Sequence, residues 1–347
     1  FIDNSKLYFM LFVKENVNKI KCELEEEIIL KGGFFIKTLR FYFVLATLLL
    51  AVTILNAQPD NFKIEKIKEP YLGQNCVTKV PEPFAEGIIH DNLHTSPTFS
   101  PDGREVYWKP IDALGVYRMK LDGSKWSFPE EVKFSKDIID YRAPFFSPKG
   151  DKMFFLCRST IPYSPLPMKV NIWYMEKKKD GWSSPKPVCR DINCLNVNWQ
   201  VSATNNGSLY FSVKKDGRED IYYSKCVNGI YYEPERLSDA INTESMVETT
   251  PYIAPDESYM IFSRMELSKD GYSDLYVSFK QNDGSWSKAR NLGKTFNGEY
   301  HNLSPQVSPD GKYLFYLQTY QGKSRCMWVD ASILDEYRPE NYPITEK

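Results

Sequence analysis

An eight-residue phrase recurs five times along the chain and constrains its fold more than any other feature. The copies run over Ser96–Gly103, Ala143–Gly150, Gln200–Gly207, Thr250–Glu257 and Ser304–Gly311. The first reads Ser-Pro-Thr-Phe-Ser-Pro-Asp-Gly, and the third departs most from it, ending in Thr-Asn-Asn-Gly. The residues just before the turn are 47, 57, 50 and 54 positions apart. A period of about fifty residues, flanked by strand-forming residues, is typical of a propeller or an array of repeats.

Each copy is read as four strands. The first ends at the Pro-Asp-Gly turn, where proline presets φ and glycine accepts a positive φ. The second is a continuous apolar run, such as 105–108 and 313–316, which is typical of a strand buried on both faces. The third ends at an Asp-Gly or Asn-Gly pair, the strongest short hairpin signal. An aromatic residue then opens the fourth strand, at Trp126, Trp182, Tyr231 and Trp286.

A four-stranded antiparallel unit repeated around an axis is a propeller blade. The fifth copy lacks a fourth strand, because the chain leaves the pattern after Asp330. The segment Val77–Phe84, ahead of the first copy, resembles an unattached fourth strand. We therefore predict an all-β fold, a five-bladed β-propeller of four-stranded antiparallel blades whose ring is closed by this N-terminal strand. Six blades are the alternative, if Phe62–Gly87 forms most of a blade of its own.

The repeat resembles the TolB-type, WD-like β-propeller repeat of exported bacterial proteins. The resemblance rests on Phe-Ser-Pro-Asp-Gly, an aromatic strand and then Asp-Ile-Tyr or Asp-Leu-Tyr, and it covers roughly Val77–Asp330. The stretch from Asp274 to Gly293 is similar to propellers fused to peptidoglycan-binding outer-membrane modules. The resemblance implies a propeller of the cell envelope. The anchoring role of those relatives does not transfer directly, since the sequence holds no such module.

The N-terminal quarter of the chain predicts export. Fifteen uncharged residues, Phe41–Leu55, follow Lys37 and Arg40, as in a signal peptide, and the run is short for a membrane span of about 20 residues. We predict an over-extended or disordered leader at 1–36, a signal peptide at 37–57 and an N-terminal extension at 58–76. The propeller is predicted at 77–335, followed by a C-terminal tail at 336–347. The mature chain would lie in the periplasm, at the cell surface or outside the cell.

Composition and cysteines narrow the class of partner. The formal net charge is −1 with no basic cluster, which disfavours nucleic acid. We expect a monomer with no membrane span after processing, no cofactor and no assigned metal. In an exported protein an even number of cysteines permits disulfides. Six of the seven cysteines follow the leader, and Cys189 and Cys194, close together in a predicted loop, are the candidate pair.

The candidate binding site lies where the chain enters each innermost strand. Loops there ring one mouth of a propeller's channel, and loops on a rigid scaffold are where binding residues concentrate. The candidates are His94, Tyr141, Arg142, Asn198, Trp199, Glu248, His301 and Asn302. Polar loop residues also face water without binding anything, and aromatic ones also pack blades together. A metal held by His90, His94 and His301 stays open as an alternative, without an assigned ligand set.

The sequence favours binding over catalysis. It contains no Gly-x-Ser-x-Gly nucleophile elbow, the motif of the hydrolase domain in propeller-capped peptidases. Glycoside hydrolysis needs two carboxylates at a defined separation, and few acids lie near the predicted mouth. We therefore predict a non-catalytic scaffold for a protein or a cell-envelope glycan, with no catalytic residues. The alternative is a carbohydrate-active enzyme, a polysaccharide lyase or glycoside hydrolase, at the channel mouth.

Overall fold

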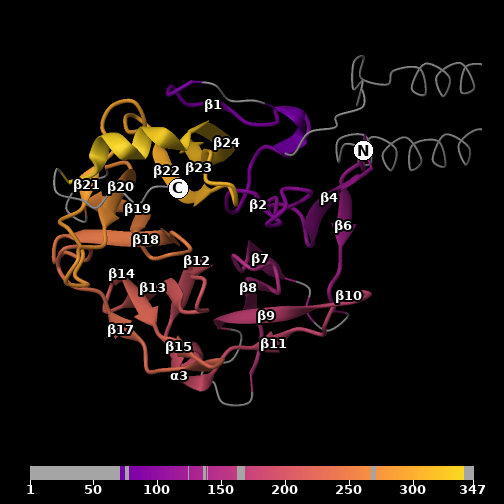
Figure 1. The fold of residues 1–347 in the computed structure, drawn as a ribbon, viewed down its shortest axis with the longest axis horizontal. Coiled ribbons are helices and arrows are strands. Elements are labelled where there is room, and N and C mark those ends of the chain that lie inside the picture. Colours follow the sequence, from indigo (N-terminus) through magenta and orange to yellow (C-terminus); the bar gives the residue numbers. More distant parts are fainter. Residues whose placement is uncertain are drawn as a thin grey trace, which may run out of the picture. The chain divides into compact units, whose positions relative to one another are not determined.

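Five antiparallel sheets form a ring in the computed structural model (Figure 1). The model describes residues 71–74, 78–123, 125–135, 138, 140–161, 169–266 and 271–339. The predicted leader and signal peptide, most of the extension (Cys76 included) and the last residues of the tail lie outside them. Across the described ranges, helices are too short and too polar to span a bilayer. The five-bladed prediction is confirmed, and the six-bladed alternative is wrong.

Each blade follows one copy of the repeat. Blade 1 holds β2 (Thr98–Phe99), β3 (Glu105–Trp108), β4 (Val116–Asp122), β5 (Lys125–Trp126) and β6 (Glu130–Val132). Blade 2 holds β7 (Tyr141–Phe146), β8 (Lys152–Arg158), β9 (Val170–Lys178), β10 (Gly181–Trp182) and β11 (Lys186–Pro187). Blade 3 holds β12 (Val197–Ala203), β13 (Leu209–Lys215), β14 (Arg218–Ser224) and β17 (Glu235–Arg236), with the hairpin β15 (Cys226–Val227) and β16 (Ile230–Tyr231) beside it. Blade 4 holds β18 (Met246–Ile253), β19 (Tyr259–Glu266), β20 (Asp274–Phe279) and β21 (Arg290–Asn291).

Blade 5 joins the two ends of the described chain. It holds β22 (His301–Val307), β23 (Tyr313–Tyr320) and β24 (Lys323–Asp330), and its outer strand is the N-terminal β1 (Glu82–Pro83) (Figure 1). Glu82 pairs with Trp328 in antiparallel register, and the amide of Phe84 donates to the carbonyl of Cys326 at 2.9 Å. The predicted closure by the N-terminal strand is therefore confirmed.

The repeated turns are fixed by a side-chain oxygen as well as by glycine. In blade 1 the Ser100 hydroxyl donates to Asp102 Oδ1 at 2.6 Å and accepts from the amide of Glu105 at 2.8 Å. Gly103 has a φ of +66°, which glycine adopts at no steric cost. The third blade keeps the same arrangement with Thr204 and Asn206, whose Oγ1 and Oδ1 lie 2.7 Å apart. The degraded copy of the phrase therefore still makes the same kind of turn.

The outer strands differ from the prediction, because they are split in two. Trp126 lies in β5, which pairs with the end of β4, whereas β6 pairs with the start of β4. Between the two pieces the Ser127 hydroxyl accepts the amide of Lys120 at 3.1 Å, replacing a main-chain partner. The corresponding serines of blades 2 and 4, Ser183 and Ser287, accept third-strand amides in the same way at 3.0 Å. The aromatic residue thus packs inward, and the outer strand proper starts a few residues later.

The core lies between the blades. Second-strand residues such as Val106, Tyr107 and Trp108 have no solvent exposure, as expected for strands buried on both faces. Each aromatic side chain buried in this way removes about 150–250 Å² of surface from water. A 3-10 helix, η2 (Ala331–Tyr337), follows β24. The hydroxyl of its Tyr337 donates to the carbonyl of Leu292 at 2.6 Å. This contact ties residues beyond the predicted propeller end, 335, to blade 4.

Candidate functional site

The innermost strands each carry a bulge near their start, except for the short β2. The register shifts at Arg142/Phe145, Asn198/Val201, Thr249/Tyr252 and Leu303/Gln306. One residue in each bulge has a left-handed backbone, namely Ala143, Trp199, Thr250 and Ser304. Three of the four are small and precede proline, whereas blade 3 has Trp199 followed by Gln200. A left-handed φ is a genuine outlier for a bulky residue, and Trp199 has a φ of +60°. The Trp199 side chain is also 41% exposed.

Trp199 meets His94 from a blade that is not its neighbour. Their ring centroids lie 6.3 Å apart at an interplanar angle of 44°. His94 precedes blade 1 and Trp199 belongs to blade 3, so the two side chains meet across the middle of the ring. His94 is largely buried, and its pKa falls to about 4, first because of burial and then because of the nearby cations Arg142 and Lys109. The imidazole is therefore neutral at pH 7.

Arg142 and Lys109 are the two cations that act on His94 at this mouth. The Arg142 guanidinium binds Asp140, with Nε 2.9 Å from both carboxylate oxygens. The ammonium of Lys109 donates to the carbonyls of Pro110 and Ala113. Next to His94 two cations thus stand against one carboxylate, while Asp112 and Glu131 also act on Lys109, and Arg158 acts on Asp140. The structure therefore brings together three of the predicted residues, His94, Arg142 and Trp199, close to the charged side chains of Lys109 and Asp140.

The remaining predicted residues turn into the blades. Tyr141 is 1% exposed and packs on Phe134 and Phe155. Asn198 Nδ2 donates to Glu219 at 2.9 Å, and Asn302 is fully buried. His301 Nδ1 accepts from the amide of Ser273 at 3.2 Å, away from His94. These side chains hold loops and blades together rather than facing one ligand.

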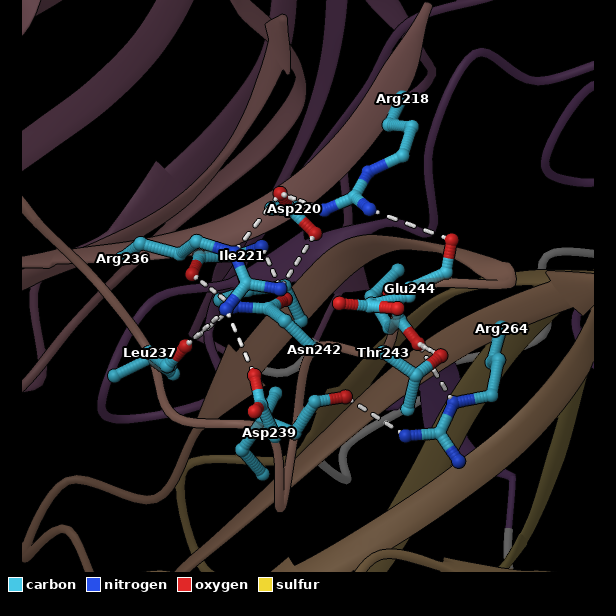
Figure 2. Close-up of polar contacts among 12 residues, drawn as sticks. Arg218, Asp220, Ile221, Arg236, Leu237, Asp239, Asn242, Thr243, Glu244 and Arg264 are labelled. Carbon is cyan, nitrogen blue, oxygen red and sulfur yellow. Dashed lines mark hydrogen bonds and ion pairs between the residues drawn. The ribbon is translucent and has the colours of Figure 1, made fainter.

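Glu248 is part of a buried charge network between blades 3 and 4. Its side chain has no exposure, and its Oε1 accepts from Arg264 Nε at 3.0 Å and from Thr243 at 2.9 Å. Burial raises the pKa of this carboxyl despite the arginine. Figure 2 shows Arg264 beside Thr243, and Arg218 and Arg236 on either side of Asp220. The network fastens β14, β17, β18 and β19 and leaves Glu248 closed to solvent.

The histidines and the candidate disulfide are also dispersed. His90 Nδ1 accepts from Trp108, the His94 ring lies beside that of Trp199, and His301 Nδ1 accepts from Ser273. Within the described ranges, no three His, Cys, Asp or Glu side chains gather closely enough to hold a metal. Cys189 and Cys194 flank the one-turn helix α3 (Arg190–Asn193), and no disulfide joins them. Five residues along a helix advance about 7.5 Å, beyond the Cα separation of most disulfides.

Two glutamines, which the sequence did not single out, cross the middle of the ring. Gln200 Nε2 donates to the carbonyls of Pro251 and Pro305, each at 3.2 Å, and so links blade 3 to blades 4 and 5. Gln306 Nε2 donates to the carbonyl of Ser96 at 3.2 Å, linking blade 5 to blade 1. The available signal was the first position of the third copy, where Gln200 stands in place of the serine, alanine or threonine of the other copies. These bonds separate the two ends of the channel.

A cavity of about 270 Å³ lies at the opposite end, among the repeated turns. Every blade contributes to it, and the residue after each pre-turn position lines it, namely Pro101, Pro148, Asn205, Pro255 and Pro309. Its wall is mostly apolar. The full lining is Pro97, Thr98, Phe99, Pro101, Phe145, Phe146, Ser147, Pro148, Ala203, Asn205, Tyr252, Ile253, Pro255, Gln306, Val307, Pro309 and Phe315. The sequence prediction placed no site at this end.

Comparison with known proteins gives likenesses of fold. No family model matches the chain, and no curated protein matches its sequence. A putative TolB from Agrobacterium tumefaciens matches with TM-score 0.47 and 18% identity over 68% of this chain and 76% of that one. TolB from Acinetobacter baumannii matches with TM-score 0.44 and 15% identity over 69% of this chain and 54% of that one.

An enzyme stands beside these TolB structures. The endo-arabinase from Bacteroides thetaiotaomicron VPI-5482 matches with TM-score 0.48 and 13% identity over 73% of this chain and 96% of that one. One fold hosts many functions, so these likenesses assign no function. The five sheets and the repeated turn make this chain a five-bladed β-propeller.

Proposed function

We propose that this chain is an exported, non-catalytic scaffold that binds a protein or a cell-envelope glycan at the mouth marked by Trp199. The observation that carries the proposal is the display of this indole, 41% exposed on an innermost strand and in a left-handed backbone conformation. Strained residues persist where the surrounding structure over-determines them, and they cluster at ligand sites. The aromatic side chain is thus held at the centre of the ring instead of being buried between blades.

The groups around Trp199 suit recognition. The imidazole of His94 is neutral and lies beside the indole, and its buried Nδ1 has no partner among the described residues. Arg142 supplies a guanidinium, a group enriched with tryptophan at interface hot spots. An apolar ring face beside polar groups fits both a sugar ring and a peptide side chain.

The carbohydrate-active alternative has less support. Hydrolysis by a pair of carboxylates requires both to reach the substrate. Glu248 is buried and bound to Arg264, and Asp140 is bound to Arg142. His301 is directed toward Ser273. The groups an enzyme would need do not converge at the mouth, whereas a binding surface tolerates their separation.

Affinity capture from envelope extracts tests the scaffold directly. The exported chain is the bait, compared with Trp199→Gly, which removes the indole and permits the same backbone, and with Phe128→Ala. Phe128 is a matched control, since it is 73% exposed on blade 1, away from the innermost strands. We expect the wild type and Phe128→Ala to retain the same partner and Trp199→Gly to lose most of it. Retention by all three variants would contradict the site.

A polysaccharide panel tests the alternative. We expect no release of reducing ends or unsaturated products by the wild type. The informative variant is Glu248→Gln, which keeps a hydrogen bond to Arg264 and so preserves the fold better than alanine. Turnover by the wild type that is lost in Glu248→Gln would replace the scaffold with an enzyme.

A further inference from the structure

We propose that the cavity among the five turns is a second binding site, a socket for one apolar side chain flanked by basic residues on a partner protein. It lies at the end of the channel opposite Trp199 and is independent of the proposed function of that mouth. The socket has about 270 Å³. Sites for drug-sized ligands occupy about 300–1,000 Å³, so this volume suits a single large side chain.

The lining supports binding without chemistry. Phe145, Phe146, Tyr252 and Phe315 supply aromatic walls, and no Asp, Glu, His, Cys, Lys or Arg is among the lining residues. General acid–base catalysis and metal binding both need such side chains. The inner end is closed, because Gln306 lines the socket while bonded to Ser96, and Gln200 crosses the ring one step further along the strands.

The charge around the socket selects a basic partner. We define the rim as the four residues after each pre-turn position, 101–104, 148–151, 205–208, 255–258 and 309–312. It carries the carboxylates of Asp102, Asp151, Asp256, Glu257 and Asp310 and the cations Arg104, Lys149 and Lys312. Five negative and three positive charges leave a net of −2 within these turns, and Lys280, whose ammonium lies 3.8 Å from the Glu257 carboxylate, reduces the excess to −1.

Two of the rim carboxylates, Asp102 and Asp310, are built into their turns, and the hydrogen bonds they accept lower the pKa of each despite partial burial. Asp102 accepts from Ser100 and from the amide of Arg104, and Asp310 accepts from Ser308 and the amide of Lys312. In blade 3 Asn206 makes the same bonds, accepting from Thr204 and from the amide of Ser208. The chain therefore shows that asparagine serves in this turn. Aspartate-to-asparagine variants remove charge and leave the turn intact.

Three short peptides test the socket by calorimetric titration into the full chain. They are the acetylated amides Lys-Trp-Lys, Glu-Trp-Glu and Lys-Ala-Lys. We expect saturable binding of Lys-Trp-Lys, roughly fivefold weaker binding of Glu-Trp-Glu, and none of Lys-Ala-Lys. The double variant Asp102→Asn/Asp256→Asn should reduce the preference for lysine over glutamate.

Two variants locate the binding. Asn205→Trp covers the socket from its exposed rim and should abolish binding of Lys-Trp-Lys, while Trp199→Gly at the other mouth should leave it unchanged. Circular dichroism checks that each variant folds. If Asn205→Trp does not fold, the double variant Asp102→Asn/Asp256→Asn still tests the socket. Equal binding of all three peptides, binding that survives a folded Asn205→Trp, or no saturation up to about 10 mM would each overturn the socket.

Discussion

At the scale of single residues, the candidate site depends on where each bulge directs its side chain. Trp199 is the left-handed residue of its bulge, as Ala143, Thr250 and Ser304 are in blades 2, 4 and 5, and its indole lies beside His94. The sequence predicted that residues where the chain enters each innermost strand would differ between blades. It did not predict burial of Glu248, because its partner Arg264 is 16 positions away and faces it only in the β18–β19 register.

His94 predicts a pH dependence of stability. Its pKa is about 4 in the folded protein, against 6.5 as the ordinary value, so the unfolded chain binds a proton first as pH falls. Its contribution is fully present above pH 6.5 and is lost between pH 6.5 and 4, by about 3 kcal/mol. Urea unfolding at pH 7 and pH 4 measures it. His94→Gln should lose less stability over this interval than the wild type, and equal losses would contradict the assignment.

At the scale of elements, buried asparagines fasten the connections that leave blades 2, 3 and 4 to the third strands of those blades. Asn193, Asn242 and Asn297 precede the next inner strand, and each amide bonds the main chain of a third-strand residue twice. For Asn242 the partner is Ile221, at 2.7 and 2.9 Å (Figure 2). The sequence shows these asparagines 49 and 55 residues apart. The sequence analysis missed these asparagines because their side chains bond the main chain of a strand in place of a neighbouring strand. Such a role does not show in the spacing of hydrophobic residues.

Asn242→Ala should lower the free energy of unfolding by about 1–3 kcal/mol. The substitution leaves the buried amide of Ile221 without a partner, which costs about 1–3 kcal/mol. The Ile221 carbonyl loses one of two donors and keeps the amide of Leu237 at 3.0 Å. Asn196→Ala, at an exposed position before β12, is the control and should change stability by less than about 0.5 kcal/mol. Urea titration of both variants gives the comparison. Similar values for the two would mean that the buried amide is not a fastener.

At the scale of the whole molecule, one short strand closes the ring. Phe84 directly follows β1 and is 3% exposed, with its ring centroid 4.9 Å from those of both Phe315 and Trp328. The repeat count and the missing fourth strand predicted this closure from the sequence. The turn-end socket was not predicted, since it exists only where turns from all five blades converge.

Phe84→Ala should therefore destabilise the entire propeller. Removing a buried phenylalanine costs about 3–5 kcal/mol, and here the loss falls on the contact that joins β1 to blade 5. Phe128→Ala removes the same side chain from an exposed position and should be nearly neutral. Thermal unfolding compares the two. A small effect of Phe84→Ala would show that the ring holds without its N-terminal strand.

We propose that Trp199, whose indole has no counterpart in the bulges of the other blades, binds the partner, and that the repeated strands and turns do not. Photo-crosslinking in cells tests it most directly, with a benzophenone side chain placed at position 199 in one chain and at position 128 in another. Both positions are exposed aromatic sites, but only Trp199 lies on an innermost strand. We expect a discrete adduct from position 199 and none from position 128. No adduct at 199, or the same adduct from both positions, would contradict it.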